Sequence, residues 1–566
     1  MDDIKNVQIT VAEQIANFIA SKNVPAVFQL SGGMIAFISD AIARLGQTKL
    51  INLKHEQSAG FAGEGITRIS GIPSIVLATS GPGATNLVTP IASCFFDSTP
   101  VIFVTGQVNT NEIRKNKEQR QNGFQELEIV EVVRSIVKFS VRVESPEEVL
   151  TVFEKAWRIS QDGRPGPVLI DIPIDLQQKL IFPISQPGND VGLAHSEKIN
   201  VALAELSQLI SESRFPLILI GGGVRSANCS DLVQKFIEQS RIPAVYSLMG
   251  KDALPNDHEL NFGFIGSYGN RASNQSLMQS DLLIVLGSRL DVRQTGSSIV
   301  DFTSGRRIYR VDIDDHELEG RLVAEYSYNF DLEFFMNSLL QMDLTYDSES
   351  FQVKHKERLA KFPPSLEQIQ SHSLSPDLVM RSISEMETDS SVYVVDVGQH
   401  QMWAAQSIQL LKNQRFLTSG GLGAMGFSIP AAIGVAFATG ERVAVIVGDG
   451  CAQLSLNELE TIHFYQLPIT IYVINNMQHG MVAQFQEENM ASNFVGTRDG
   501  YSTPDFEKIA EAYGITSHTI LTEADLESLK KTRKKHVTGP LLISVTINRD
   551  FKALPKIGGS VGMKDL

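Results

Sequence analysis

The chain has 566 residues, 43% of them hydrophobic and 20% charged, which predicts a compact globular protein of roughly three to four domains. Its formal net charge of −15 argues against a nucleic-acid partner, because no basic patch large enough to offset that charge is evident. The three cysteines lack metal-ligand spacing and no apolar run is long enough to cross a membrane, so we expect a cytoplasmic protein without disulfides, zinc or membrane contact.

Short apolar runs alternate with helical periodicity through the first third of the chain. The pattern of 12–21 predicts a helix, and the runs 74–78, 101–104 and 167–173 predict buried strands. Strands that alternate with helices indicate a parallel α/β sheet. The breaker-rich segment 186–190 then predicts a linker, and we place the end of a first domain at residue 190.

The same pattern of strand followed by turn recurs in the middle of the chain. Apolar runs occupy 216–220, 282–287 and 307–312, and the first of them leads into Gly221, Gly222 and Gly223. These runs predict a second α/β domain over residues 191–345. We expect the polar, charged stretch 343–361 to be the second linker and 346–566 to form the third domain.

The last third of the chain repeats the organisation of the first. Residues 539–545 resemble 166–172, since a Gly-Pro pair leads into a final apolar strand in both. This likeness predicts internal symmetry. We therefore expect an α/β protein of three domains, each a mainly parallel sheet flanked by helices, in which two related domains flank a third.

Two apolar strands in the third domain end in oxygen-bearing side chains. The run 443–448 leads into Asp449, and the run 471–475 leads into Asn476. The 27 positions from Asp449 to Asn476 leave room for one crossover helix between adjacent parallel strands. Both side chains then lie at the carboxyl ends of the strands, where open sheets bind ligands. Hard oxygen ligands suit Mg²⁺, and the glycines beside Asp449 let the backbone approach a diphosphate.

Together with other segments, this pattern resembles the thiamine diphosphate (ThDP) enzymes, and among them the catalytic subunits of acetohydroxyacid (acetolactate) synthases. The matching segments are 53–60, 79–86, 396–403, 418–427 and 479–482. The resemblance runs from about residue 8 to residue 550. It implies a pyrimidine-binding domain over 1–190, a central FAD-binding-type domain over 191–345 and a diphosphate- and Mg²⁺-binding domain over 346–566.

The resemblance also assigns catalytic roles. The Glu56 carboxylate is expected to promote the tautomer of the cofactor's pyrimidine whose amino group removes the proton from the thiazolium carbon. Met425 is expected to support the bent shape of the cofactor, and the Gly423 carbonyl to hold its amino group. Phe124, Gln125 and Phe485 complete the catalytic set that the resemblance implies.

The expected cofactor ligands are spread over the first and third domains. Asp449, Asn476 and the backbone carbonyl of Gln478 are expected to bind Mg²⁺, and Gln399 and His400 to contact the diphosphate. The other positions that the resemblance assigns to ThDP are Gly32, Gly33, Gly448, Gly450, Cys451, Gly480, Met481 and Val482.

The central domain follows the order of the family's FAD-binding pattern. The positions that the resemblance assigns to FAD are Arg164, Gly221, Gly222, Leu248, Met249, Gly266, Gly287, Arg289, Arg293 and Asp312. The flavin of this family is mostly structural, so FAD binding does not by itself imply redox chemistry. The resemblance further implies a homodimer or homotetramer whose active sites lie at the chain interface.

Several positions depart from the family pattern, and they bear on the acceptor substrate. Phe485 stands where tryptophan is typical, Met34 where a small alanine is usual, and Ser267-Tyr268 where Met-His is common. The charged segment between Val108 and Phe124 is also longer than is usual in the family.

We therefore predict an enzyme that decarboxylates pyruvate and transfers the two-carbon unit to a carbonyl acceptor, either a second 2-keto acid or a bulkier ketone. One alternative is a branched-sugar carboligase that uses a nucleotide-linked keto-sugar. A second is an FAD-dependent pyruvate oxidase, and a third is a non-catalytic cofactor-binding assembly partner.

Overall fold

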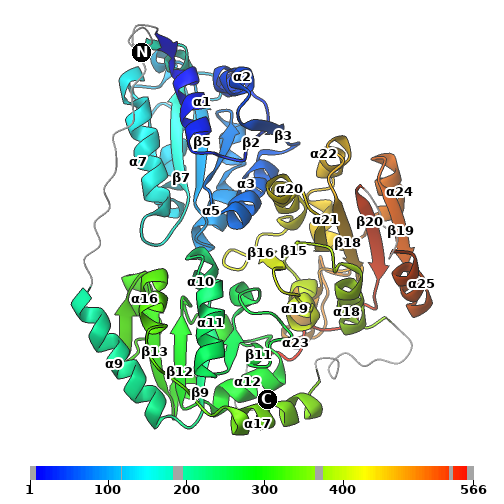
Figure 1. Ribbon diagram of the computed structural model, residues 1–566. Coiled ribbons are helices and arrows are strands. Elements are labelled where there is room, and N and C mark those ends of the chain that lie inside the picture. Colours follow the sequence, from blue (N-terminus) through cyan, green and yellow to red (C-terminus); the bar gives the residue numbers. More distant parts are fainter. Residues whose placement is uncertain (1–7, 117, 183–195, 364–373, 534–538, 558–566) are drawn as a thin grey trace.

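The computed structural model describes residues 8–116, 118–182, 196–363, 374–533 and 539–557 (Figure 1). Within them, the chain forms three six-stranded sheets whose neighbouring strands all run parallel. Two short strands, β1 (Ile9–Thr10) and β8 (Leu180–Ile181), pair antiparallel beside the first sheet. The α/β class and the three parallel-sheet units predicted from the sequence are confirmed.

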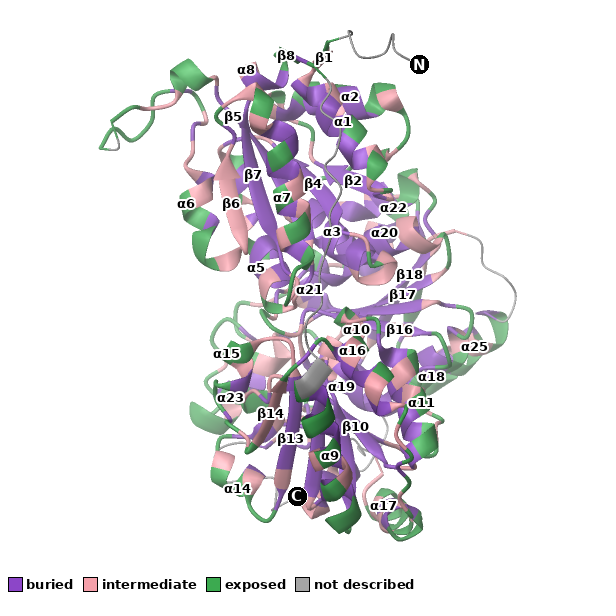
Figure 2. Ribbon diagram, turned by 60° about the vertical axis from the view of Figure 1, so that its left-hand side comes forward, coloured by how far each residue is buried: buried purple, intermediate pink, exposed green. Residues whose placement is uncertain are grey.

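The first unit is built on a sheet of strand order β3-β2-β4-β5-β7-β6. Its strands are β2 (Ala26–Gln29), β3 (Lys49–Asn52), β4 (Ser74–Ala78), β5 (Val101–Gln107), β6 (Phe139–Arg142) and β7 (Val168–Pro173). Its helices are α1 (Val11–Ser21), α2 (Ala36–Leu45), α3 (Glu56–Ser70), α4 (Pro82–Thr85), α5 (Val88–Phe96), α6 (Ile129–Val133), α7 (Val149–Gln161) and α8 (Ile174–Gln177). The central strands β4 and β5 are buried along their whole length, as expected of a parallel sheet covered on both faces (Figure 2).

The third unit has the order β16-β15-β17-β18-β20-β19, which places its strands as the first unit does. Its strands are β15 (Val392–Val395), β16 (Arg415–Thr418), β17 (Val443–Gly448), β18 (Ile469–Asn475), β19 (Thr516–Ile520) and β20 (Leu541–Thr546). Its helices are α18 (Pro376–Met386), α19 (Gln399–Ser407), α20 (Ser428–Thr439), α21 (Asp449–Gln453), α22 (Glu458–Phe464), α23 (Gly480–Asn489), α24 (Phe506–Ala512) and α25 (Glu523–Arg533). The predicted internal symmetry is therefore present in the topology, but two helices, α21 and α22, connect β17 to β18 where one was expected.

The central unit has the strand order β11-β10-β9-β12-β13-β14. Its strands are β9 (Pro216–Ile220), β10 (Ala244–Tyr246), β11 (Asn261–Phe264), β12 (Leu282–Leu286), β13 (Arg307–Asp312) and β14 (Tyr326–Asn329). Its helices are α9 (Ser196–Glu212), α10 (Gly223–Ser226), α11 (Ser230–Ser240), α12 (Arg271–Gln279), α13 (Val292–Thr295), α14 (Ile299–Thr303), α15 (Asp315–Leu318), α16 (Leu332–Leu339) and α17 (Glu349–Lys361).

Helix α17 replaces much of the expected second linker. Phe351 is fully buried beside Phe215, and the His355 ring stacks on Phe262 with the ring centres 4.0 Å apart. These two side chains bind a mostly polar helix to the central unit, so the stretch 343–361 is largely structured. The first expected linker, 186–190, lies outside the described residues.

The first and third units are joined by helix α3 and helix α20, which lie side by side (Figure 1). Gly65 of α3 faces the Ala431 carbonyl and Gly434 of α20 faces the Ala62 carbonyl, and a side chain at either glycine would clash with that backbone. The two helices occupy equivalent places after the second strand of their units. The internal symmetry therefore extends to the contact between the two units.

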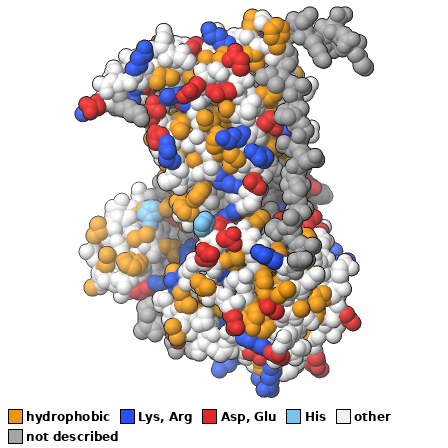
Figure 3. Space-filling view, turned by 90° about the vertical axis from the view of Figure 1, so that its left-hand side faces the viewer, with side chains coloured by type: hydrophobic (Ala, Val, Ile, Leu, Met, Phe, Trp, Pro, Cys, Tyr) orange, Lys and Arg blue, Asp and Glu red, His pale blue; other side chains and the backbone are white. Residues whose placement is uncertain are grey.

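Three further features bear on the expectations drawn from the composition: the surface charge, the hydropathy of the helices and the state of the cysteines. On the face that Figure 3 shows, basic and acidic side chains are interspersed. No described helix is both long and apolar enough to cross a membrane. Cys94, Cys229 and Cys451 are buried and unpaired.

Candidate active site

Glu56 begins helix α3 and is buried at its N-terminus. The strand β3 ends four residues earlier, so the parallel topology delivers this carboxylate to the carboxyl edge of the first sheet. The Asn86 side-chain amide donates a 2.9 Å hydrogen bond to Oε2. Oε1 faces Gly83, where an added Cβ would lie 3.2 Å away. One carboxylate oxygen is thus held by the protein and the other faces a position without a side chain.

Other predicted residues of the first unit lie in segments that approach Thr79 and Gly81. Gln125 has a left-handed backbone, with φ 66°, and packs against Gly81, where an added Cβ would lie 2.9 Å from its own Cβ. Phe124, the preceding residue, is 80% exposed. Gly32 lies against the Thr79 side chain, and Gly33 has open space around it. These residues therefore gather with Glu56 at one edge of the first sheet.

Asp449 lies at the carboxyl end of β17 and is buried. Burial raises the pKa of its carboxyl to about 6, although the Tyr501 hydroxyl, which donates a 3.0 Å bond to Oδ2, and the backbone N–H groups of Gly450 and Gln478 lower it. A buried carboxylate without a paired cation is costly, and a divalent ion would offset that cost. The burial of Asp449 therefore fits a Mg²⁺ site.

The residues expected to complete that site lie beside Asp449. Asn476 follows β18 and donates from Nδ2 to Oε1 of Gln399 over 3.1 Å. The Gln478 side chain is engaged, since Nε2 donates to the Arg549 carbonyl (2.6 Å) and Oε1 accepts from Arg498 Nε (2.7 Å). This engagement agrees with the expectation that its backbone carbonyl, and not its side chain, is the ligand.

Two glycines at this edge of the third sheet pack closely against neighbouring side chains. A side chain at Gly480 would clash with Gln399, and one at Gly450 would meet the His479 ring. His400 Nε2 accepts a 3.1 Å hydrogen bond from the Gly448 N–H, and burial lowers the pKa of His400 to about 4. The imidazole is therefore neutral at neutral pH. The buried Cys451 thiol donates to the Val397 carbonyl over 3.1 Å.

The turn that carries Gly423 and Met425 is held at both ends by carboxylates. Asp396 accepts the backbone N–H groups of Gly426 (3.1 Å) and Ser428 (2.8 Å) from the third unit itself. At the other end, Asp97 of the first unit accepts those of Gly420 and Gly421. Gly423 is left-handed, with φ 73°, and Met425 is half-buried.

Helix α23 begins at Gly480 and presents the remaining expected positions. Val482 and Phe485, three residues apart, are 51% and 50% exposed and share one helix face, and Met481 is half-buried. Phe485 therefore presents its ring to an open space.

A cavity of about 460 Å³ lies where the three units meet. It opens at the carboxyl ends of β9, β12 and β13 and is also bounded by residues 96–100 of the first unit and Gly420 of the third. The predicted flavin-binding residues that line it are Arg164, Gly222, Leu248, Met249, Gly287, Arg289, Arg293 and Asp312.

The two other predicted flavin positions support the wall of this cavity. Gly221 packs against the Gly287 carbonyl, and Gly266, with φ 108°, packs against the Arg293 carbonyl, so a side chain at either would clash with backbone. Arg164 of the first unit donates to Asp314 (3.0 Å) and Glu317 (2.7 Å) of the central unit. Glycine turns and basic groups at the carboxyl edge of a parallel sheet fit a dinucleotide such as FAD.

The predicted residues thus form two groups at the sheet edges and a third around the cavity. Among the described residues, no hydrogen bond joins Glu56 to Asp449, Asn476 or Gln478. Glu56 lies on the first unit, whereas Asp449, Asn476 and Gln478 lie on the third, and we call these two sets of residues the two half-sites.

Sequence reasoning missed three polar residues that organise these half-sites. Tyr501 donates to Asp449, Asp97 binds the glycine turn from another unit, and the Glu126 carboxylate accepts three backbone N–H groups. Spacing along the chain does not identify the partners of Tyr501 and Asp97, because they lie in other segments.

Comparison with known proteins agrees with this geometry. Residues 9–132 match the N-terminal TPP-binding domain of thiamine pyrophosphate enzymes, residues 203–339 the central domain and residues 396–545 the C-terminal TPP-binding domain. Acetolactate synthase 2, chloroplastic, of Nicotiana tabacum is 34% identical over 572 residues, which cover 98% of this chain and 84% of that protein. The acetolactate synthase large subunit of Corynebacterium glutamicum is 32% identical over 575 residues, covering 99% of this chain and 90% of that protein.

Proposed function

The chain belongs to the thiamine pyrophosphate enzymes, as an acetolactate synthase-like carboligase that decarboxylates pyruvate, and we propose that it joins the two-carbon unit to a second 2-keto acid or a bulkier ketone. The observation that carries the proposal is the pair of half-sites. Glu56 is buried beside Gly83 at one sheet edge, and Asp449 with Asn476 forms an oxygen-rich edge on the other sheet.

We propose that Glu56 holds and releases the proton that activates the cofactor. Thiamine diphosphate, when bound, supplies the carbon nucleophile and accepts the electron pair left by CO₂. Asn86 fixes Oε2 of Glu56, which leaves Oε1 to exchange a proton with a ring nitrogen at the position that Gly83 keeps open. Gly423 and Met425 are proposed to hold the pyrimidine end from the other half-site.

Asp449, Asn476 and the Gln478 carbonyl are the proposed Mg²⁺ ligands. The carboxylate is buried, and both amide-bearing side chains beside it are oriented by hydrogen bonds to Gln399, Arg498 and Arg549. A ligand set of hard oxygens suits Mg²⁺ bound together with a diphosphate.

FAD is the proposed occupant of the cavity between the units. The cavity carries Arg289 and Arg293, and close backbone packing at Gly221 and Gly266 shapes its wall. Its position beside Gly420 gives the flavin a structural role next to the turn that carries Gly423 and Met425. The oxidase alternative has a direct test. A pyruvate oxidase would consume oxygen or bleach bound flavin when pyruvate is added.

We propose a homodimer with shared active sites, as the resemblance to acetolactate synthases implies; the placement of Glu56 and Asp449 on different units is compatible with it. If Glu56 of one chain faces Asp449 of another, each dimer has two complete sites. A non-catalytic role is disfavoured, because Glu56, Asp449 and Asn476 are all present and positioned.

The chemical class of the acceptor is tested by assaying a panel of candidate acceptors. The purified protein, supplied with ThDP, Mg²⁺, FAD and pyruvate, is given 2-keto acids, simple ketones and nucleotide-linked keto-sugars, and the carbon–carbon bonded product is measured. Rapid acetolactate formation from pyruvate alone supports a 2-keto acid acceptor, and slow turnover that rises sharply with a ketone supports the bulkier class. Because Phe485 leaves more room than tryptophan, Phe485→Trp should lower ligation of bulky ketones by about tenfold and spare acetolactate formation.

A further inference from the structure

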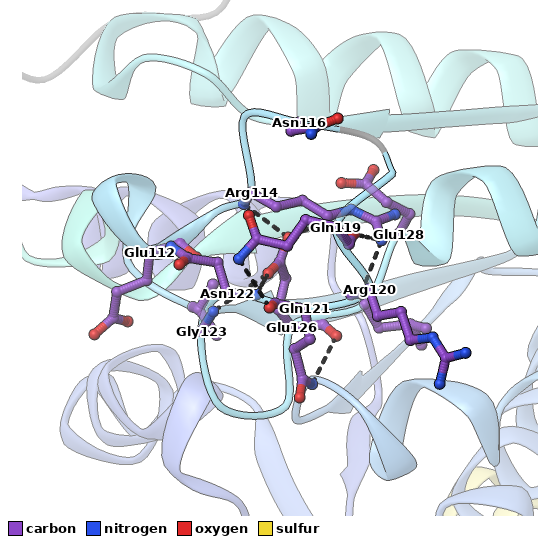
Figure 4. Close-up of polar contacts among 12 residues, drawn as sticks. Glu112, Arg114, Asn116, Gln119, Arg120, Gln121, Asn122, Gly123, Glu126 and Glu128 are labelled. Atoms are coloured by element: carbon purple, nitrogen blue, oxygen red, sulfur yellow. Dashed lines mark hydrogen bonds and ion pairs between the residues drawn. The ribbon is translucent and has the colours of Figure 1, made fainter.

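The described residues of the segment from Glu112 to Glu126, here called the 112–126 loop, fold around one buried carboxylate (Figure 4). Glu126 Oε1 accepts the backbone N–H of Arg114 at 2.9 Å. Its Oε2 accepts those of Asn122 at 2.6 Å and Gly123 at 3.3 Å. The Glu126 carboxylate thus links the first residues of the loop to its last residues.

Further bonds close the outer part of the loop on itself. Arg114 Nη1 donates to the carbonyls of Gln119 (2.9 Å) and Arg120 (2.8 Å), and Asn122 Nδ2 donates to the Glu112 carbonyl (2.9 Å). Burial opposes ionisation of Glu126, but the three N–H groups hold its pKa below the usual range. The carboxylate is therefore charged at neutral pH, where charge-assisted bonds are strongest.

The end of the loop is anchored to the core of the first unit. Gln107, the last residue of β5, donates from Nε2 to the Leu127 carbonyl (2.7 Å) and to the buried Asp171 carboxylate (3.0 Å). The loop leaves β5 as an exposed excursion from the sheet (Figure 2), but its return is fixed at Leu127.

Phe124 and Gln125 lie between Gly123, which bonds to Glu126, and this anchor. Gln125 adopts its left-handed backbone against Gly81, and Gly83 faces Glu56. Phe124 is 80% exposed, although it is flanked by Gly123 and Gln125, whose backbones are both held in place. An exposed aromatic side chain on a fixed backbone suits contact with a substrate or with the facing half-site.

We propose that Glu126 is a positioning residue that fixes Phe124 and Gln125 beside the Glu56 half-site, and that the 112–126 loop thereby selects the acceptor. This inference rests on the proposed carboligase function. In this proposal the loop acts after CO₂ is released. It determines whether the two-carbon unit is joined to a correctly placed acceptor or is released as acetaldehyde.

The test compares Glu126→Gln with the control Glu128→Gln. The glutamine at 126 keeps the shape but turns an NH₂ group toward backbone N–H groups, so at least one bond is lost. Glu128 pairs with Arg142 at 3.0 Å and bonds none of the three loop N–H groups, so its variant removes the same charge two residues beyond the loop.

Three quantities are measured: the ratio of ligated product to acetaldehyde, the KM for the acceptor, and the rate of trypsin cleavage after Arg114, Lys115 and Arg120. In Glu126→Gln we expect the ratio to fall by about tenfold or more with a raised acceptor KM, since small misplacements have large kinetic effects. Cleavage in the loop should be faster. Glu128→Gln should match the wild type in all three, also at high salt.

Equal ratios and equal cleavage in the two variants would overturn the proposal. Should Glu126→Gln fail to fold, Arg114→Met removes the bonds to Gln119 and Arg120 and the 3.8 Å ion pair with Glu126, and it should shift the ratio in the same direction; an unchanged ratio there would count against the proposal. If the wild type forms no ligated product at all, the carboligase function fails instead, while trypsin cleavage still reports whether Glu126 orders the loop.

Discussion

The Asp97 carboxylate, at the end of α5, accepts a 2.7 Å hydrogen bond from the backbone N–H of Gly421, a residue more than three hundred positions later in the chain. Its other oxygen accepts the Gly420 N–H at 3.0 Å. One carboxylate of the first unit therefore holds the turn of the third unit that leads to Gly423 and Met425.

Replacing Asp97 with asparagine should weaken ThDP binding. The amide can accept only one of the two N–H groups, and a lost bond to a charged group costs about 1.5–3 kcal/mol, or roughly tenfold or more in Kd. Fluorescence titration with ThDP measures the effect, and Asp40→Asn, on the exposed surface of α2, is the control. Equal affinities in the two variants would show that the turn does not need Asp97.

Replacing Glu56 with glutamine should lower turnover by roughly 10²- to 10⁴-fold, because the amide cannot exchange a proton with the cofactor ring. The variant keeps the shape of the side chain, so the fold and ThDP binding should persist. Steady-state CO₂ release and ThDP titration are measured on the same preparation. Near-normal turnover would remove Glu56 from the activation step.

Replacing Asp449 with alanine should abolish retention of Mg²⁺ and ThDP together on gel filtration, since the proposed carboxylate ligand is lost. Tyr501→Phe removes only the hydroxyl that donates to Asp449, so it should retain both groups with lower affinity. Retention of Mg²⁺ by the alanine variant would place the metal elsewhere.

Shared active sites predict complementation between two inactive variants. A mixed dimer of one Glu56→Gln chain and one Asp449→Ala chain contains one intact site if each site uses both chains, so it should recover about half of the wild-type activity. Co-expression with two different tags and tandem purification isolates the mixed dimer. Activity no greater than that of the separate variants would mean that Glu56 and Asp449 of one chain serve the same site.

Asp171 predicts a specific pH dependence of stability. Burial raises the pKa of its carboxyl to about 7 in the folded state, above the usual 3.8, although the Thr105 and Gln107 hydrogen bonds lower it. The folded chain therefore holds a proton that the unfolded chain has released between these values, so this group's contribution to stability falls as the pH rises through about 7.

Asp171→Asn cannot ionise and should lose that dependence. The difference in Tm, variant minus wild type, should become more positive as the pH rises from about 5 to about 8. Thermal unfolding at several pH values measures it, with Asp40→Asn as the exposed control. A difference that stays constant over this range would show that Asp171 is already ionised in the folded state.

The sequence is sufficient to predict several of the buried strands. The apolar runs 216–220 and 443–448 coincide with β9 and β17, because strands of a covered parallel sheet are apolar on both faces. Helix α17 was misread as a linker, since its sequence is mostly polar and only a few of its side chains, such as Phe351 and His355, are buried.

Contacts between residues far apart in the chain could not be predicted from the sequence. Nothing in the spacing of Asp97 or Tyr501 indicates its partner, because the fold brings together positions far apart in the chain. The partners of Glu126 lie within 12 residues of it, but its three bonds depend on the path of the loop. The roles of Glu56, Asp449, Asn476 and the flavin-site residues remain predictions that the geometry supports.

The most direct test of the proposed function follows the carboxyl and keto carbons of pyruvate separately. With ThDP, Mg²⁺, FAD and pyruvate labelled separately at its carboxyl and keto carbons, we expect ThDP-dependent release of the carboxyl label as CO₂ and transfer of the keto label into a product with a new carbon–carbon bond. Appearance of the keto label only in acetate, with oxygen consumed, or no ThDP-dependent release of CO₂, would contradict it.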